Sequence, residues 1–209
     1  MEKRYQNIIQ IYNTVAQEYQ DKFANDTVYN HSYDLLLKHM KPTHKNVLDV
    51  ACGFGKITHY LLNQTPTLSV LGIDAAENMV NLAKQNNPKA SFKVMDCREI
   101  NSLQQGFDVI IFGFCFPYLT KDNVLKLIEE ASILLNSNGL LYISTMIGDY
   151  EKDSRITTSS DGKNSMFIHY HEPSYLIEAL EEQKLKILEN YTKLYQEGGD
   201  TDLFLIAKK

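Results

Sequence analysis

The sequence predicts an α/β fold in which a mostly parallel, doubly wound sheet carries helices on both faces. From residue 46 to residue 145, short β-rich runs alternate with stretches of helical periodicity. Such alternation favours parallel strands, because each parallel connection needs a long crossover. A chain of 209 residues with 44% hydrophobic residues is also long and apolar enough for one sizeable domain.

Each expected element follows from its own stretch of sequence. Helical spacing of apolar residues predicts a first helix around Ile8–Tyr19 and a second that carries Tyr33–Met40 and ends before Pro42. The expected strands of the central part are Asn46–Val50, Leu68–Ile73, Ser91–Met95, Phe107–Phe112 and Leu140–Thr145. The expected helices between them lie near Lys56–Asn63, Glu77–Gln85 and Lys121–Leu135.

The rhythm changes after the fifth strand. Gly148–Ser165 is polar and predicts a long loop, which is followed by a short run at Met166–His171 and a helix that begins at Pro173. Two β-like stretches come next, Leu185–Tyr195 and Asp202–Ala207. The glycine pair at 198 and 199 between them predicts an antiparallel hairpin.

The composition narrows the class of protein. A formal charge of −5 and a pI of about 5.7 leave no broad positive surface for a phosphate backbone, so we expect no nucleic-acid partner. The longest apolar run, Val109–Phe116, is strand-sized, and no secretory signal follows Met1, so we expect no membrane attachment. Three cysteines without metal-like spacing (Cys52, Cys97 and Cys115) favour a cytoplasmic protein with no disulfide and no metal site.

The strongest local signal is a strand, a small-residue loop and a helix over Val47–Lys56. Gly53 and Gly55 allow the backbone to approach a ligand closely, and the following helix offers free N–H groups. Asp49 precedes this loop. A pyrophosphate would gain nothing from a carboxylate there, whereas a ligand with an ammonium group would.

Two further carboxylates stand at strand ends. Asp74 ends the second strand, where it can accept hydrogen bonds from both ribose hydroxyls of a nucleoside. Asp96 ends the third strand, where an adenine amino group could donate to it. The carboxyl edge of an open α/β sheet is where such folds bind ligands, so three acids there indicate a nucleoside site.

These residues resemble a known family. Leu48–Gly55 is similar to motif I of the class I S-adenosylmethionine-dependent methyltransferases, and Gly72–Met79 to the ribose-binding segment that follows it. Phe107–Ile111 and Asn138–Leu141 are similar to the fourth-strand motif and the entry to strand five. The resemblance runs from about Tyr12 to the C-terminus and implies a Rossmann-like seven-stranded sheet in the order 3-2-1-4-5-7-6, with strand seven antiparallel. One departure is the Glu-Glu-Gln-Lys-Leu turn at 181–185, where many relatives have Ala-Gly-Phe.

The resemblance also implies which residues hold S-adenosylmethionine. Asp49 and Gly53 would lie beneath the methionine part, Asp74 would bind the ribose, and Asp96 the adenine amino group. The full set of cofactor-binding residues that it implies is Tyr19, Asp49, Ala51, Gly53, Gly55, Asp74, Ala75, Met79, Asp96, Cys97 and Phe114. For Tyr12 and Tyr19, packing of an amphipathic helix is as good an interpretation as a role in closing the pocket.

His169 and His171 are the candidate catalytic residues. In a strand the two side chains would share one face, and histidine titrates near neutral pH, which suits a general base or an acceptor anchor. A solvent-facing or hydrogen-bonded structural pair is the alternative interpretation. A metal site is weaker, because no third ligand is evident.

The function that the sequence predicts is therefore methyl transfer from S-adenosylmethionine to an unidentified small-molecule acceptor. One domain would span 1–209, with a helical cover (1–41), a cofactor-binding half (42–146) and a substrate-side loop, helix and hairpin (147–209). A non-catalytic cofactor-binding regulator or partner subunit is an alternative. An NAD-dependent oxidoreductase would need a third glycine where Thr58 stands, and the motif of base amino-group methyltransferases is absent at 113–118.

Overall fold

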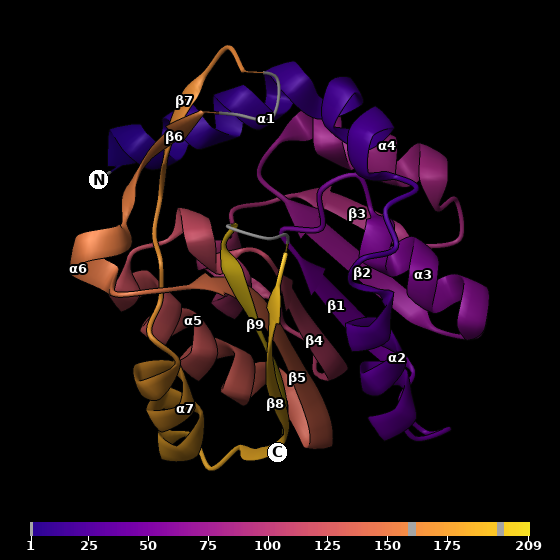
Figure 1. Ribbon diagram of the computed structural model, residues 1–209. Helices are drawn as coiled ribbons and strands as arrows, with labels where there is room; N and C mark the ends of the chain where they lie inside the picture. Colours follow the sequence, from indigo (N-terminus) through magenta and orange to yellow (C-terminus); the bar gives the residue numbers. More distant parts are fainter. Residues whose placement is uncertain (1, 159–161, 196–198) are drawn as a thin grey trace.

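A seven-stranded sheet forms the centre of the molecule (Figure 1). The structure is a computed structural model and describes residues 2–158, 162–195 and 199–209. The strands of this sheet are β1 (Asn46–Val50), β2 (Ser69–Asp74), β3 (Ser91–Val94), β4 (Phe107–Gly113), β5 (Leu135–Ile147), β8 (Lys186–Leu194) and β9 (Thr201–Lys208). Their order is β3-β2-β1-β4-β5-β9-β8, and β9 pairs antiparallel with both β5 and β8. The predicted sheet order and the antiparallel last strand are confirmed.

Helices cover both faces of the sheet. They are α1 (Glu2–Phe23), α2 (Asn30–His39), α3 (Lys56–Gln64), α4 (Glu77–Asn86), α5 (Lys121–Leu134), α6 (Tyr150–Asp153) and α7 (Pro173–Glu182), with the 3-10 turns η1 (Cys97–Ser102) and η2 (Phe116–Tyr118). The α5, α7 and η1 segments pack together over one face, and α2 packs with α3 over the other. The predicted doubly wound architecture is confirmed.

Alternation along the central strands explains the two hydrophobic layers. On β4, Val109 and Ile111 join the cluster beneath α2 and α3, whereas Ile110 and Phe112 join the cluster beneath α5 and α7. All four side chains have no exposed surface. A strand that is buried on both faces reads as a continuous apolar run, which is the pattern of this segment.

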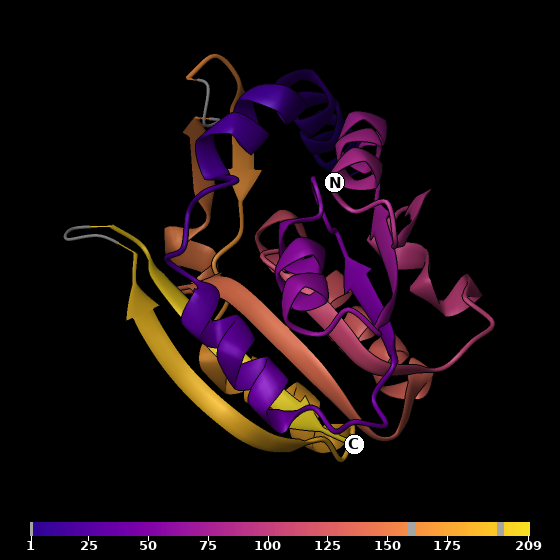
Figure 2. The same cartoon turned by 90° about the vertical axis from the view of Figure 1, so that its right-hand side faces the viewer.

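A separate cover lies across the carboxyl edge of the sheet. The strands β6 (Arg155–Thr158) and β7 (Ser165–Ile168) pair antiparallel as a second, two-stranded sheet, which stands against α1 (Figure 2). Ile8, Ile11 and Val15 of α1 form one apolar cluster with Met166 and Ile168. This cluster joins segments about 150 residues apart, and the edge where ligands bind in this architecture lies beneath it.

The expected long loop at Gly148–Ser165 is wrong in part. It contains α6 and β6, and β7 begins at its end. Asp149 caps α6 by accepting from the backbone N–H of Glu151 at 3.1 Å and of Lys152 at 3.0 Å. Every residue of β6 is exposed, so this strand has no apolar alternation by which a sequence could reveal it. Of the junction expected at residues 197–200, residues 197 and 198 lie outside the described residues.

The strand expected around His169 and His171 is shorter than predicted. β7 ends at Ile168, so the two histidines do not share a strand face. His171 instead makes an isolated parallel bridge with Ile147. At the departure from the family pattern, Lys184 takes the left-handed conformation (φ 59°) in which a glycine is usually found after a helix. Across the described residues, no helix is both long enough and apolar enough to cross a membrane.

Candidate active site

The loop between β1 and α3 is shaped by three residues in the left-handed conformation. Ala51, Gly53 and Gly55 have φ of 55°, 54° and 80°. A Cβ atom added at Gly53 would have no other atom within 4 Å, so the backbone of Gly53 faces open space. A Cβ atom added at Gly55 would lie only 2.5 Å from Asn87 Nδ2, so a glycine here allows the loop to pack closely against the end of α4.

Asp49 lies beneath this loop and is only 2% exposed. Its Oδ2 accepts a hydrogen bond of 2.7 Å from the Thr58 hydroxyl. Burial raises the pKa of Asp49 to about 6, against the hydrogen bonds from Thr58, and the negative charge of Asp74 adds to the rise. A positive charge above the loop would reverse this penalty, so the arrangement favours a cationic ligand group. Thr58 stands where a dinucleotide fingerprint needs its third glycine, and it is fully buried.

Asp74 marks the end of β2 on the same edge. Its carboxylate accepts from the backbone N–H of Gly53 at 2.9 Å and of Ala76 at 2.8 Å. Burial raises the pKa of Asp74, and these two backbone donors oppose the rise. The two bonds fix the carboxylate between the β1 loop and the start of α4.

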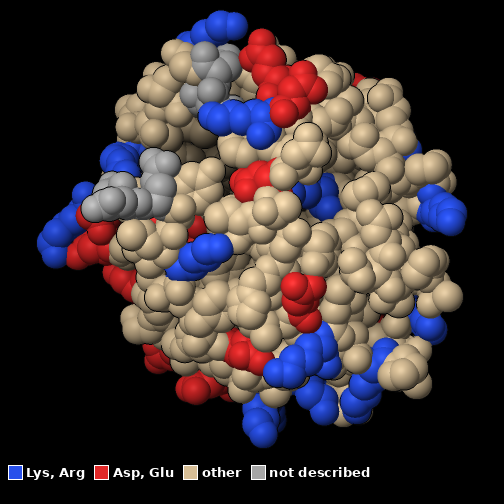
Figure 3. Space-filling model, turned by 45° about the vertical axis from the view of Figure 1, so that its right-hand side comes forward, with Lys and Arg blue, Asp and Glu red and all other residues tan. Residues whose placement is uncertain are grey.

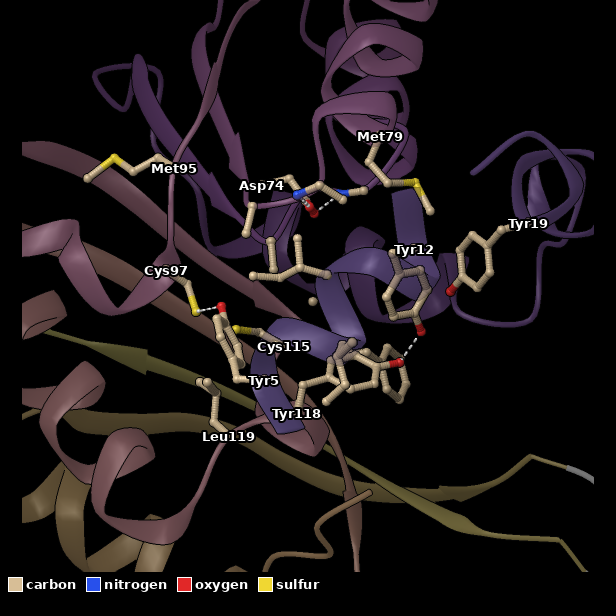
Figure 4. Close-up of a pocket in the computed structure, with 18 residues that line it drawn as sticks. Tyr5, Tyr12, Tyr19, Asp74, Met79, Met95, Cys97, Cys115, Tyr118 and Leu119 are labelled. Carbon is tan, nitrogen blue, oxygen red and sulfur yellow. Dashed lines mark hydrogen bonds between the residues drawn. The ribbon is translucent and has the colours of Figure 1, made fainter. Parts of the chain in front are cut away.

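A cavity of about 120 Å³ opens over Asp74, and we refer to it as the Asp74 cavity (Figure 4). Its lining residues come from α1, from the β1 and β2 ends, and from the segments after β3 and β4: Tyr5, Ile8, Ile9, Tyr12, Tyr19, Ala51, Gly53, Asp74, Ala75, Ala76, Met79, Met95, Cys97, Gly113, Phe114, Cys115, Tyr118 and Leu119. It therefore lies at the carboxyl edge, where the strand order reverses between β1 and β4.

Two non-glycine residues with positive φ line this cavity. Ala51 directly follows β1, and Phe114, with φ of 52°, directly follows the neighbouring β4. The Phe114 N–H donates to Ser144 O at 3.0 Å, which holds the turn in place. Such conformations cost free energy, and in proteins they cluster at functional sites. Their pairing on adjacent strand ends supports a site at this edge.

Tyrosines of α1 form the roof of the cavity. Tyr12 and Tyr19 lie edge to face with ring centroids 5.5 Å apart, and the Tyr12 hydroxyl bonds to that of Tyr118 (Figure 4). Tyr5, about two helical turns before Tyr12, reaches the far end of the cavity beside Cys97. Tyr12 and Tyr19 therefore pack against neighbouring rings and also line the cavity. The structure agrees with both interpretations of these two residues, helix packing and closing of the pocket.

At that far end of the cavity, the Asp96 carboxylate forms hydrogen bonds with other residues of the protein. Its carboxylate accepts from Arg98, with the shortest contact at 2.5 Å, and from the Tyr5 hydroxyl at 3.1 Å. Burial alone would raise the pKa of Asp96, but the hydrogen bonds from Arg98 outweigh it and the pKa is lowered. The Arg98 guanidinium also lies over the Tyr5 ring, with its carbon 4.0 Å from the ring centroid.

The structure thus brings most of the implied cofactor residues together. Eight of the eleven line the Asp74 cavity: Tyr19, Ala51, Gly53, Asp74, Ala75, Met79, Cys97 and Phe114. Asp49, Gly55 and Asp96 do not line it. The lining residues that the sequence did not single out include Tyr5, Met95, Cys115 and Leu119. Met95 and Cys115 lie next to strand ends, and this position could have predicted them from the sequence. Tyr5 belongs to a helix far from these strands in the sequence, so no local pattern predicts its place in the cavity.

The two candidate catalytic histidines lie in different environments, and neither lines the Asp74 cavity. His171 has no exposed surface, bonds through Nδ1 to the Tyr175 hydroxyl, and bonds through Nε2 to Phe116 O at 2.9 Å. Burial lowers the pKa of His171 to about 4, against the bond to Phe116. His169 is half-buried, and its Nδ1 is a buried atom with no hydrogen-bond partner in the structure. Burial and then the charge of Arg4 lower the pKa of His169.

The structure defines a Rossmann-like α/β protein with a cavity at the carboxyl edge of its sheet. Solved structures share the fold along nearly the whole chain. A 1,6-didemethyltoxoflavin-N1-methyltransferase of Burkholderia thailandensis, solved with S-adenosylhomocysteine, has a TM-score of 0.76 at 17% identity, over 100% of this chain and 89% of that one. The DhpI–S-adenosylhomocysteine complex has a TM-score of 0.74 at 17% identity, over 99% and 97%.

Sequence comparisons agree with the fold. Residues 47–139 match a family model described as a methyltransferase domain. Protein 235L of Invertebrate iridescent virus 6, whose name places it among methyltransferases, is 30% identical over 71% of this chain and 56% of its own. A malonyl-[acyl-carrier protein] O-methyltransferase of Paenibacillus sp. is 29% identical over 50% of this chain and 40% of its own.

The methyltransferase-domain match and the shared fold agree with the resemblance of the motifs to the class I S-adenosylmethionine-dependent methyltransferase family. The matched residues 47–139 run from β1 to the glycine inside β5, and so include the loop together with Asp49, Asp74 and Asp96. The chain spans about half the length of the curated relatives that it matches.

Proposed function

We propose that this protein transfers a methyl group from S-adenosylmethionine to a small-molecule acceptor. The observation that carries the proposal is the partly buried Asp74 carboxylate, which stands at the carboxyl edge beside the open backbone of Gly53. Each carboxylate oxygen can accept more than the single backbone bond that it has, so Asp74 keeps capacity for two ribose hydroxyls. The residues present therefore fit the nucleoside part of the cofactor.

The acidic floor fits the other end of the cofactor. The charge of Asp74 adds to the cost of ionising the buried Asp49, and an ammonium or sulfonium group would offset that cost. When bound, the cofactor supplies a methyl group that its sulfonium has already activated. Ala75 and Met79 would flank the ribose and adenine, and Phe114 would lie near the sulfonium. The chain's contribution is then to hold donor and acceptor in line, which can be worth roughly 7–11 kcal/mol.

Access to this site requires the cover to open. Pockets for drug-sized ligands usually measure about 300–1,000 Å³, whereas the Asp74 cavity measures about 120 Å³. The Tyr5 hydroxyl also donates to Asp96, the carboxylate that the resemblance assigns to adenine. We propose that residues 1–41 act as the cover that withdraws, residues 42–146 as the cofactor half, and residues 147–209 as the acceptor side.

Surface charge supports a small acceptor over a nucleic acid. On the face shown in Figure 3, acidic and basic side chains are interspersed over a surface that is largely uncharged. The formal charge of −5 gives no general attraction for phosphate backbones. Of the two histidines, His169 is the one that could take a proton from the acceptor, because both ring nitrogens of His171 are bound.

Calorimetry with the whole chain tests the proposal. We expect binding of S-adenosylmethionine and S-adenosylhomocysteine and no comparable binding of NAD. Tight binding of NAD with no response to either sulfur compound would overturn it. Release of S-adenosylhomocysteine in the presence of a panel of small metabolites then separates an enzyme from a silent binder, because a non-catalytic protein would bind the cofactor and release no product.

A further inference from the structure

A second cavity of about 300 Å³ lies next to the Asp74 cavity, on the side of the candidate histidines. It is bounded by the start of α1, the segment from η2 into α5, α6 and β7. Tyr5, Ile8 and Tyr118 line both cavities, so these three side chains form the wall between them. Two of the three belong to α1.

Aromatic rings form one side of this second cavity. The Tyr150 and His169 rings are stacked, with centroids 5.3 Å apart and planes 12° apart. The Phe167 ring meets the His169 ring edge-on at 4.8 Å. Rigid flat walls of this kind favour a flat aromatic ligand, because offset and edge contacts add to the burial of apolar area.

Positive charge stands beside these rings. The Arg4 guanidinium carbon lies 4.6 Å from the centroid of the Phe167 ring, and within the described residues no carboxylate pairs with Arg4. The α5 N-terminus contributes Thr120 and Asn123 to the lining, and a helix start carries partial positive charge. The carboxylate among the described lining residues is that of Glu151, which is exposed. The balance favours a ligand with a negative group near Arg4.

His169 supplies a neutral polar contact between these features. It lines the cavity, and its buried Nδ1 lacks a partner within the described structure. A buried polar atom without a partner costs free energy, which a ligand group could remove by bonding to it. Its backbone N–H donates to Pro117 O at 2.8 Å, and its ring stacks on Tyr150, so the residue is held in place while Nδ1 stays available.

We propose that the second cavity is the acceptor pocket, and that the acceptor is a flat aromatic carboxylate. The ring lies against Tyr150, His169 and Phe167, the carboxylate pairs with Arg4, and a polar substituent reaches His169. This inference rests on the proposed function for the role of acceptor. The binding of an aromatic carboxylate is separate from that function and can be measured without methyl transfer.

The test is an NMR titration of the ¹⁵N-labelled full chain with three probes. Benzoate is aromatic and anionic, benzamide is nearly the same shape and neutral, and cyclohexanecarboxylate is anionic and not aromatic. We expect benzoate to bind at least tenfold more tightly than either of the others, with the shifts centred on the amides of Phe167 and His169. Equal affinity for benzoate and benzamide, or shifts confined to other elements, would overturn the proposal.

Two variants make the test specific. Arg4→Gln should reduce the preference for benzoate over benzamide about tenfold, whereas Lys3→Gln removes a neighbouring exposed charge that does not line the cavity and should keep the preference. Equal losses in both variants would mean that benzoate responds only to general charge, and the proposal fails. Circular dichroism checks that both variants fold.

A parallel titration with S-adenosylhomocysteine separates this inference from the proposed function. Binding of benzoate without binding of S-adenosylhomocysteine would refute the methyltransferase function and leave an aromatic-acid site. Binding of S-adenosylhomocysteine without binding of benzoate would refute this inference alone. Binding of both supports both.

Discussion

The two neighbouring cavities are built in opposite ways. The Asp74 cavity has one carboxylate among its described lining residues, Asp74 at the end of β2, which lies within the segment 47–139 that matches the family model. The second cavity has Arg4 from the start of α1 and, from a distant part of the chain, the stacked rings of Tyr150 in α6 and of His169 just after β7. Charge of opposite sign on the two sides suits a cationic donor next to an anionic acceptor.

The two candidate histidines also differ, because one has a ring nitrogen available for a ligand and the other supports the fold. At the Asp74 cavity the lining carboxylate, Asp74, has a raised pKa, as does Asp49 beneath the neighbouring loop. The second cavity is lined by His169, whose Nδ1 has no partner in the described structure, and not by His171. His171 is tied at both nitrogens, whereas His169, two residues earlier, has a nitrogen to offer. The following predictions test these contrasts, beginning with the largest effect.

The largest effect is expected for Asp49→Asn on stability. The pKa of Asp49 is raised in the folded state, so its stabilising contribution is complete below the unfolded value of 3.8 and is lost as pH rises through about 6. Asparagine keeps an acceptor for Thr58 and removes the charge, so above pH 6 the variant should be more stable by up to roughly 3 kcal/mol.

Denaturant unfolding of both proteins from pH 4 to pH 7 measures this effect. The difference should vanish near pH 4 and grow through pH 6, and a difference independent of pH would contradict the assignment. The same variant should bind S-adenosylmethionine more weakly, because the charge facing the ammonium group is gone.

The next effect concerns ligand binding. Asp74→Ala should weaken the binding of S-adenosylhomocysteine by about 1.5–3 kcal/mol, the scale of hydrogen bonds to a charged group. His169→Gln, on the other cavity, should leave that affinity at the wild-type value. Calorimetry on both folded variants decides the point: an unaltered dissociation constant for Asp74→Ala would remove Asp74 from the cofactor site.

The two histidines should differ in stability. His171→Gln leaves the Tyr175 hydroxyl or Phe116 O without its buried partner, at a cost of about 2 kcal/mol, which lowers the Tm of a chain of this size by roughly 4–8 °C. His169→Gln should shift the Tm much less. The pKa of His171 is lowered to about 4, so its contribution is present above pH 6.5 and is lost as pH falls towards 4. Equal Tm shifts in the two variants would refute the distinction.

The smallest effect concerns the cover. Tyr12→Phe removes the hydroxyl contact between α1 and Tyr118, so α1 should open more often by about 1 kcal/mol, or roughly fivefold in hydrogen exchange. Tyr60→Phe removes an exposed hydroxyl contact to Asp34 and serves as the control. Amides of α1 and of the Ile147–Ser165 segment should gain protection when S-adenosylhomocysteine binds. Protection that is the same with and without ligand would argue against a moving cover.

The sequence by itself determined the sheet and the loop that carries Asp74. The strand predicted at Asn46–Val50 has the bounds of β1, and the order of the seven strands was implied by the resemblance of the motifs to a known family. These features are readable because a buried parallel strand is a continuous apolar run and a strand-end acid is adjacent to it in the chain.

Only the tertiary structure decided which distant side chains meet. Tyr12 contacts Tyr118 across 106 residues, and Tyr5 contacts Asp96 across 91, so no local sequence pattern could predict either pair.

The exposed strand β6 was not predicted from the sequence because it lacks apolar alternation. Whether a histidine is locked or available depends on burial and on the partners that the fold supplies, and the fold locked His171 and left the Nδ1 of His169 without a partner. Burial likewise set the pKa of Asp49, a property that residue type alone does not contain.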